Sequence, residues 1–220
     1  MTKAVLFDLD GTFADTAPDL GAALNYVRFL HQLPALPLEI IRPHASHGAA
    51  GLLKAGFGIG PDSPQFSALR AEFLAYYDTH ICEHTVLFFG MAELLGELEQ
   101  RGVSWGIVTN KPRRFTVPLM QALGYAERAA CMVSGDTCPQ AKPHPQPLLH
   151  AAQCMGIAPQ DCIYLGDDLR DMQAAQAAGM PGIIASYGYI SSLEEISGWP
   201  AQACIDYPPQ LLRYVDNLET

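Results

Sequence analysis

Two acidic residues, Asp8 and Asp10, follow an apolar run near the start of the chain, Ala4–Phe7. A continuous apolar run of this length is typical of a strand that is buried on both faces, as in a parallel sheet. Because side chains alternate along an extended chain, both carboxylates should point to the same side. A buried carboxylate is costly without a partner, so the pair indicates a nearby cation, metal ion or shared proton.

Groups that could hold an anion follow the same strand and two later apolar segments. Gly11 permits a sharp turn that presents backbone N–H groups, with the hydroxyl of Thr12 beside it. Thr109 and Asn110 end the segment "SWGIVTN", where such residues bind anions or cap helices. Lys142 adds a cation in the proline-rich loop "QAKPHPQP". These residues predict a phosphate site.

A second acidic group lies in "YLGDDLRDM", at the end of another expected strand. Its carboxylates belong to Asp167, Asp168 and Asp171, which fall within one helical turn. The helix dipole accounts for one or two of them, because acidic residues stabilise a helix N-terminus. Two acidic strand ends that face each other need a hard cation between them, and Mg²⁺ prefers such oxygen ligands.

Together these residues predict phosphoryl transfer. Asp8 would attack phosphorus and form an aspartyl-phosphate, while Mg²⁺ and Lys142 screen the repulsion between carboxylate and phosphate. Asp10 would protonate the leaving alcohol and later take a proton from the hydrolytic water. Thr109 and backbone donors would hold the phosphoryl oxygens. Lys111 is the competing cation, and we rank it second to Lys142.

The hydrophobic pattern predicts the elements that position these groups. Thr16 and Asp19 resemble a capping box that starts a helix, and helical spacing continues to about residue 82. From Gly90 onward, helical and strand patterns alternate, as in a parallel sheet with helices on both faces. We therefore expect an α/β, Rossmann-like core of residues 1–15 and 83–220, with residues 16–82 inserted as an all-helical cap.

The composition limits the partners. The 220 residues carry a net charge of −10, which argues against nucleic acid or an anionic membrane and favours a small substrate. The six cysteines are scattered, as expected for free thiols in a reducing compartment. Because neither a signal peptide nor a long apolar span is evident, we expect a soluble cytoplasmic protein, either a monomer or a homodimer.

In order and spacing, "DLDGTFADT", "VTN", "AKP" and "GDDLRD" resemble the four motifs of the haloacid dehalogenase-like hydrolase superfamily. The resemblance covers essentially the whole chain and implies Asp8 as the nucleophile and Asp10 as the acid/base. It further implies Thr109 and Lys142 in the phosphate site. The implied Mg²⁺ ligands are Asp8, the backbone carbonyl of Asp10 and Asp167, supported by Asp168 and Asp171.

Within that superfamily, "GMAELLGELEQRGVSWGIVTNKP" and "YGYI" resemble the phosphoglycolate phosphatase-like branch. The resemblance implies hydrolysis of 2-phosphoglycolate or N-acetylmuramic acid 6-phosphate. The segments "GDDLRD", "VTNKPRRF" and "MAELL" together are slightly more similar to phosphatases of the second substrate. Both substrates carry a carboxylate, which a cationic cap would suit. The cap candidates are Arg42, His44, Ser46, His47, Gly48 and Lys54. Two alternatives are a sugar-phosphate phosphomutase and a non-catalytic phosphate-binding protein.

Overall fold

The computed structural model describes residues 2–190 and 195–216. Its centre is a six-stranded sheet with the strand order β5-β4-β1-β6-β7-β8, in which all paired neighbours are parallel. The strands are β1 (Ala4–Phe7), β4 (Ser104–Val108), β5 (Cys131–Val133), β6 (Cys162–Gly166), β7 (Gly182–Ala185) and β8 (Ala203–Ile205). The predicted parallel α/β sheet is confirmed.

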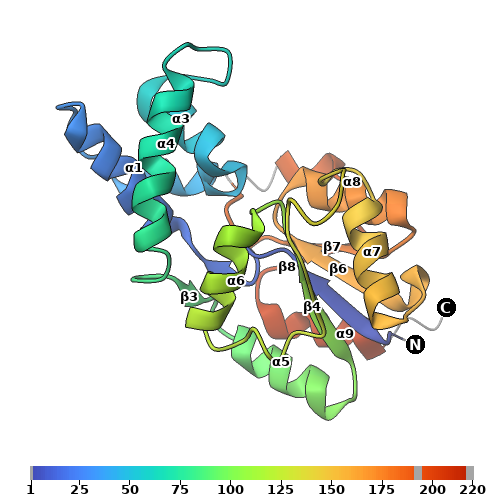
Figure 1. Ribbon diagram of the computed structural model, residues 1–220. Helices are drawn as coiled ribbons and strands as arrows, with labels where there is room; N and C mark the ends of the chain where they lie inside the picture. The colour runs from blue at the N-terminus through green and yellow to red at the C-terminus, as the bar shows by residue number, and fades with distance from the viewer. Residues whose placement is uncertain (1, 191–194, 217–220) are drawn as a thin grey trace.

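Helices cover both faces of this sheet (Figure 1). One face packs against α5 (Met91–Gln100), α6 (Arg113–Ala122) and α9 (Leu212–Asp216), and the other against α7 (Gln146–Met155) and α8 (Leu169–Ala178). Short 3-10 helices complete the core: η2 (Pro159–Asp161), η3 (Glu195–Gly198) and η4 (Pro208–Leu211).

Strand β1 lies at the middle of the sheet and is fully buried. Val5 and Phe7 belong to the apolar core on the α5 side, whereas Ala4 and Leu6 belong to the core on the α7 side. All four side chains are 0% exposed. This alternation explains why the strand is apolar at every position, because each of its faces meets a layer of helices.

The stretch between β1 and β4 contains a group of helices with an apolar core of its own, which we call the helical segment (residues 17–79). It comprises α1 (Ala17–Leu30), α2 (Leu38–Ile41), η1 (Arg42–His47), α3 (Gly48–Phe57) and α4 (Phe66–Thr79). In Figure 1 it stands beside the carboxyl ends of the sheet strands, apart from the helices that cover the sheet. Phe115 of α6 joins its apolar core, so the two parts pack against each other.

Two short strands, β2 (Ala14–Asp15) and β3 (Val86–Leu87), pair antiparallel at the two ends of the helical segment. The sequence did not predict them, because two residues are too few to show an alternating pattern. Both crossings between the core and the helical segment therefore lie side by side.

The expected capping box at the start of α1 is wrong, although a helix does begin there. Neither Thr16 nor Asp19 caps α1; Thr16 Oγ1 donates to Asp10 Oδ1 at 2.6 Å. The Asp19 carboxylate accepts hydrogen bonds from the backbone of His84 and from the backbone and hydroxyl of Thr85. Both side chains are taken by partners outside the helix, so α1 is fixed to the site and to the returning chain.

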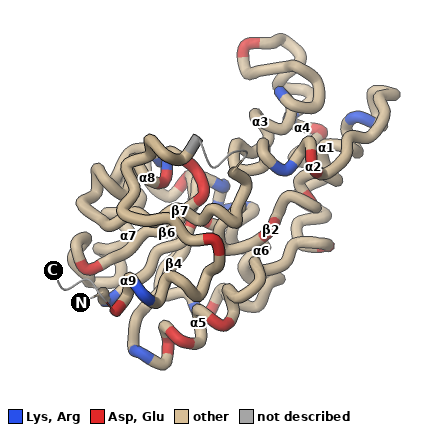
Figure 2. Tube along the Cα trace, turned by 180° about the vertical axis from the view of Figure 1, so that it is seen from behind, with Lys and Arg blue, Asp and Glu red and all other residues tan. Residues whose placement is uncertain are grey.

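Charged residues are sparse along the chain, and basic positions occur in both the helical segment and the core, interspersed with acidic ones (Figure 2). Among the described residues, no helix is both long enough and apolar enough to cross a bilayer.

Candidate active site

The candidate site lies at the carboxyl end of β1, between β4 and β6. Along the chain, β4 and β5 are added on one side of β1, and β6, β7 and β8 are then added on its other side. Ligands of open α/β sheets bind where the strand order changes sides in this way. A cavity of about 320 Å³ opens here between the core and the helical segment. Its lining from the core includes Asp8, Asp10, Thr109 and Lys142. The topology therefore gathers the ends of three separate strands around one space.

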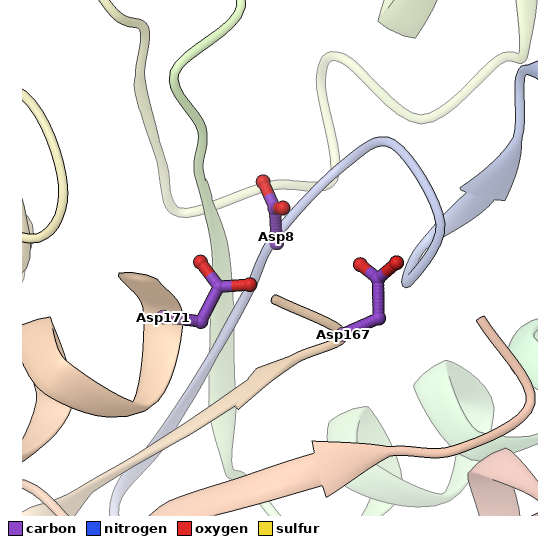
Figure 3. A group of neighbouring side chains, drawn as sticks. All are labelled: Asp8, Asp167 and Asp171. Atoms are coloured by element: carbon purple, nitrogen blue, oxygen red, sulfur yellow. The ribbon is translucent and has the colours of Figure 1, made fainter. Parts of the chain in front are cut away.

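Three buried carboxylates, those of Asp8, Asp167 and Asp171, form an acidic cluster in this site (Figure 3). One oxygen from each lies within 4.8 Å of the others. Asp8 follows β1, Asp167 follows β6, and Asp171 is in the first turn of α8. The sequence placed Asp8 and Asp167 at this position and gave Asp171 a supporting role.

Asp167 is a buried member of the cluster that accepts hydrogen bonds from three different donors. Thr12 Oγ1 donates to its Oδ1 at 2.8 Å, while Ser46 Oγ and the Tyr189 backbone N–H donate to its Oδ2 at 2.9 and 3.0 Å. Burial, followed by the charges of Asp8 and Asp171, raises the pKa of Asp167 well above its ordinary value. The hydrogen bonds to Asp167 therefore do not offset the cost of burying its negative charge beside two other carboxylates.

Gly11 makes the close approach of the loop to Asp167 possible. Its φ is +84°, in the left-handed region, and a Cβ at this position would clash with the Asp167 carboxylate. Both observations require glycine, because any other residue would be strained and would displace the carboxylate.

Lys142 is the cation of the acidic cluster and is itself almost completely buried. Its Nζ lies 2.9 Å from Asp8 Oδ1 and 2.6 Å from Asp171 Oδ1, and it also donates to the Tyr164 hydroxyl at 2.7 Å. Burial alone would lower the pKa of Lys142, but Asp171 and Asp8 outweigh burial and raise it. Lys142 is therefore charged at neutral pH and holds the Asp8 carboxylate in place.

The acidic cluster fits a divalent metal ion. Of the three buried carboxylates, Lys142 pairs with those of Asp8 and Asp171, and burial raises the pKa of Asp171 to about 7 although Lys142 opposes the shift. The donors are carboxylate oxygens, which suit a hard cation such as Mg²⁺. The predicted Asp10 ligand is a backbone carbonyl, and that assignment stays a prediction.

The Asp10 side chain points away from the acidic cluster toward a different cation. Lys111 Nζ lies 2.9 Å from Asp10 Oδ1 and 3.3 Å from Oδ2, and Thr16 Oγ1 donates to the same carboxylate. Lys111 also lies over the ring of Tyr77 from α4, with its Nζ 4.7 Å from the ring centroid. Burial would lower the pKa of Lys111, but the charge of Asp10, the Tyr77 hydroxyl and the hydrogen bonds to both groups together outweigh burial and raise it.

Two of the predicted phosphate-site residues have structural hydrogen bonds as well. Asn110 lines the cavity, but its side-chain amide donates to the Lys142 carbonyl and accepts from the Lys142 N–H, both at 2.9 Å. The Thr12 hydroxyl is used by Asp167. Thr109 is buried and lines the cavity, and its Oγ1 accepts from the Lys111 N–H at 3.2 Å. Because the Asn110 amide and the Thr12 hydroxyl have these partners, the two residues would bind a phosphate through their backbone N–H groups.

The loop at η1 brings three of the predicted cap residues to the cavity, Ser46, His47 and Gly48. His47 Nε2 lies 3.6 Å from Asp168 Oδ2. Arg170 of α8 pairs with Asp168 at 2.6 Å and donates to the Ser46 carbonyl at 2.9 Å. This network fixes the η1 loop of the helical segment to the core beside the acidic cluster.

The other predicted cap residues lie outside the lining of this cavity. Arg42 pairs with Asp15 at 2.7 Å and packs on the ring of Tyr189. His44 and Lys54 are exposed on η1 and α3. The predicted roles of Arg42, His44 and Lys54 in substrate choice stay predictions, and their positions outside the cavity lining argue against those roles.

Sequence reasoning missed two basic residues of the cavity, Arg70 and Arg170, and misjudged a third, Lys111. Lys111 was weighed only as a substitute for Lys142, whereas the two lysines hold different carboxylates. Arg70 of α4 was not considered at all, yet it lines the cavity. A usable pattern was present, because Arg70 lies four residues after Phe66 and three before Phe73, within the apolar stripe of its helix.

The family follows from comparison with known sequences. The sequence model of haloacid dehalogenase-like hydrolases matches residues 5–185, and the chain belongs to this family. The chain is 42% identical to the N-acetylmuramic acid 6-phosphate phosphatase of Pseudomonas aeruginosa, over 98% of this chain and 95% of the relative. It is also 42% identical to the phosphoglycolate phosphatase of Xanthomonas campestris, over 95% of this chain and 94% of the relative.

Solved structures agree with this assignment. The crystal structure of a predicted phosphoglycolate phosphatase from Haemophilus somnus superposes with a TM-score of 0.84 at 26% identity. The superposition covers 97% of both chains. These comparisons confirm the family that the order and spacing of the four sequence motifs had predicted.

Proposed function

We propose that this protein is a Mg²⁺-dependent phosphatase that hydrolyses a small, carboxylate-bearing phosphomonoester through an aspartyl-phosphate. The observation that carries the proposal is the separation of two carboxylates at the cavity. Asp8 is held by Lys142 within the acidic cluster, and Asp10 is held by Lys111 and Thr16. One carboxylate is thus prepared to act as a nucleophile and the other to transfer protons.

The first step uses the free oxygen of Asp8. The Leu9 N–H and Lys142 both bind Oδ1, at 2.8 and 2.9 Å, and among the described residues no donor binds Oδ2. Asp8 Oδ2 attacks phosphorus, the ester P–O bond breaks, and the leaving oxygen takes the proton of the Asp10 carboxyl group. Lys142 and the N–H groups at the ends of β1 and β4 face the phosphoryl oxygens.

The second step returns the enzyme to its starting state. The Asp10 carboxylate takes a proton from a water molecule, whose oxygen attacks the phosphorus of the aspartyl-phosphate. The bond between phosphorus and Asp8 breaks, and inorganic phosphate leaves. Asp8 and Asp167, with the Asp10 carbonyl, would hold Mg²⁺, which when bound offsets the negative charge that carboxylates and phosphate bring together.

The helical segment acts in this proposal as a cap domain over the cavity. Ser46 reaches Asp167, and Arg170 holds the Ser46 carbonyl, so the η1 loop contacts the acidic cluster directly. The paired strands β2 and β3 provide the connection about which the cap would move.

All six cysteines have free thiols, which supports a protein that works in a reducing cytoplasm.

The test is phosphate release from 2-phosphoglycolate and N-acetylmuramic acid 6-phosphate, with and without Mg²⁺, by wild type and by Asp8→Asn. We expect turnover that requires Mg²⁺ and Asp8, with an unchanged circular dichroism spectrum for the variant. Asp8→Asn enzyme that still releases phosphate at the wild-type rate would disprove the nucleophile. Exchange of sugar-phosphate isomers without phosphate release would instead indicate a phosphomutase.

A further inference from the structure

Arg70 differs from the other basic side chains of the cavity lining. Lys142, Lys111 and Arg170 each pair with a carboxylate of the protein, at 2.9 Å or less. Arg70 lines the same cavity, and it has no hydrogen bond or ion pair with any residue in the described part of the chain. Its guanidinium is therefore free to bind an anion that enters the cavity.

The position of Arg70 on α4 sets its distance from the phosphate end. Tyr77 marks that end, because Lys111 lies over its ring and pairs with Asp10. Arg70 is seven residues earlier, two helical turns along the same face and about 10 Å along the axis. Long side chains on a helix lean toward its N-terminus, so the guanidinium extends farther from Asp10.

The wall between these two ends is mainly apolar. Phe73 and Leu74 of α4, Leu20 of α1 and Phe115 of α6 line it. The buried Tyr77 hydroxyl and the neighbouring Lys111 lie at the phosphate end of this wall. Such a wall suits a spacer with apolar faces and hydroxyl edges, as a sugar ring has.

We propose that Arg70 binds the carboxylate of a substrate in which a sugar ring separates that carboxylate from the phosphate. This inference rests on the proposed phosphatase function and narrows its substrate. In 2-phosphoglycolate a single methylene group links the carboxylate to the phosphate ester oxygen, so the molecule is too short to span from Asp8 to Arg70. N-acetylmuramic acid 6-phosphate carries its carboxylate on an ether arm across the ring and meets the requirement.

The experiment compares two substrates that differ only in the acid. N-acetylglucosamine 6-phosphate has the same sugar and phosphate as N-acetylmuramic acid 6-phosphate but lacks the carboxylate arm. For Arg70→Ala we expect kcat/KM on the acidic sugar to fall about 10- to 100-fold, the usual worth of a charged hydrogen bond, mostly through KM. Its kcat/KM on N-acetylglucosamine 6-phosphate should stay at the wild-type value.

The matched variant is Arg113→Ala, which removes an exposed arginine of α6 that lies outside the cavity lining. Equal losses in Arg70→Ala and Arg113→Ala would overturn the proposal, since a general attraction of anions would explain both. So would equal losses of Arg70→Ala on the two sugars, or a wild-type preference for 2-phosphoglycolate. Wild-type enzyme that hydrolyses none of these esters would instead defeat the proposed function itself.

Discussion

Replacing Lys111 with methionine removes the cation that holds the predicted acid/base, and its effect can be estimated from the structure. The Lys111 and Asp10 side chains are 6% and 15% exposed, and they meet at 2.9 Å. A charged hydrogen bond of this kind contributes about 1.5–3 kcal/mol. Because Asp10 borders the cavity, water can replace part of the lost contact, so we expect the lower half of that range, a loss of roughly 10- to 45-fold.

The assay separates proton transfer from phosphate binding. An alkyl phosphomonoester needs a proton on its leaving oxygen, whereas the nitrophenolate of an aryl phosphate leaves without one. In Lys111→Met, kcat/KM on the alkyl ester should fall by the amount above, while kcat/KM on 4-nitrophenyl phosphate should change little. Asp10→Asn should show the same selectivity with a larger loss on the alkyl ester.

The double variant provides the decisive control. If Lys111 acts through Asp10, adding Lys111→Met to Asp10→Asn should cost almost nothing further on the alkyl ester. Additive losses, or equal losses on both ester types, would refute this reasoning and place Lys111 in phosphate binding or in folding. Thermal unfolding of each variant shows which of these two applies.

The remaining predictions concern the loop after β1 and the thiols. Gly11→Ala should destabilise the fold by more than about 1 kcal/mol and weaken Mg²⁺ binding, because its Cβ meets Asp167 and its φ is +84°. Gly102→Ala is the control, since its φ is +70° with no atom near the new Cβ; an equal loss of Mg²⁺ affinity in both would contradict the steric argument. In the native protein at pH 8, exposed Cys154 should react with iodoacetamide well before Cys131, whose pKa burial raises to about 12. Mass spectrometry of the peptides checks this order, which the reverse result would disprove.

Most of the core fold could be predicted from the sequence, because its elements carry clear periodic patterns. The tetrad Ala4–Phe7 is apolar throughout, as a strand between two layers of helices requires. The strands β2 and β3 were missed because pairing across the ends of the helical segment defines them. The capping box at Thr16 failed for a similar reason, since its hydroxyl serves Asp10 instead.

The candidate site was predictable where its residues follow strand ends, and less so elsewhere. Asp8, Thr109 and Asp167 end parallel strands, and the topology of a parallel sheet brings such ends to one edge. The sequence could not predict which carboxylate pairs with Lys111 and which with Lys142, because the pairing depends on the paths of the loops that carry them. Arg70 comes from a helix whose orientation over the cavity only tertiary packing sets.

The most direct test of the central claim is the mass of the peptide that contains Asp8, isolated after rapid acid quenching of enzyme during turnover of a phosphomonoester with Mg²⁺. The mechanism predicts a fraction of this peptide with the added mass of one phosphoryl group on Asp8, and none in Asp8→Asn. Phosphate release at full rate with no phosphorylated peptide, or with the phosphoryl group on another residue, would contradict it.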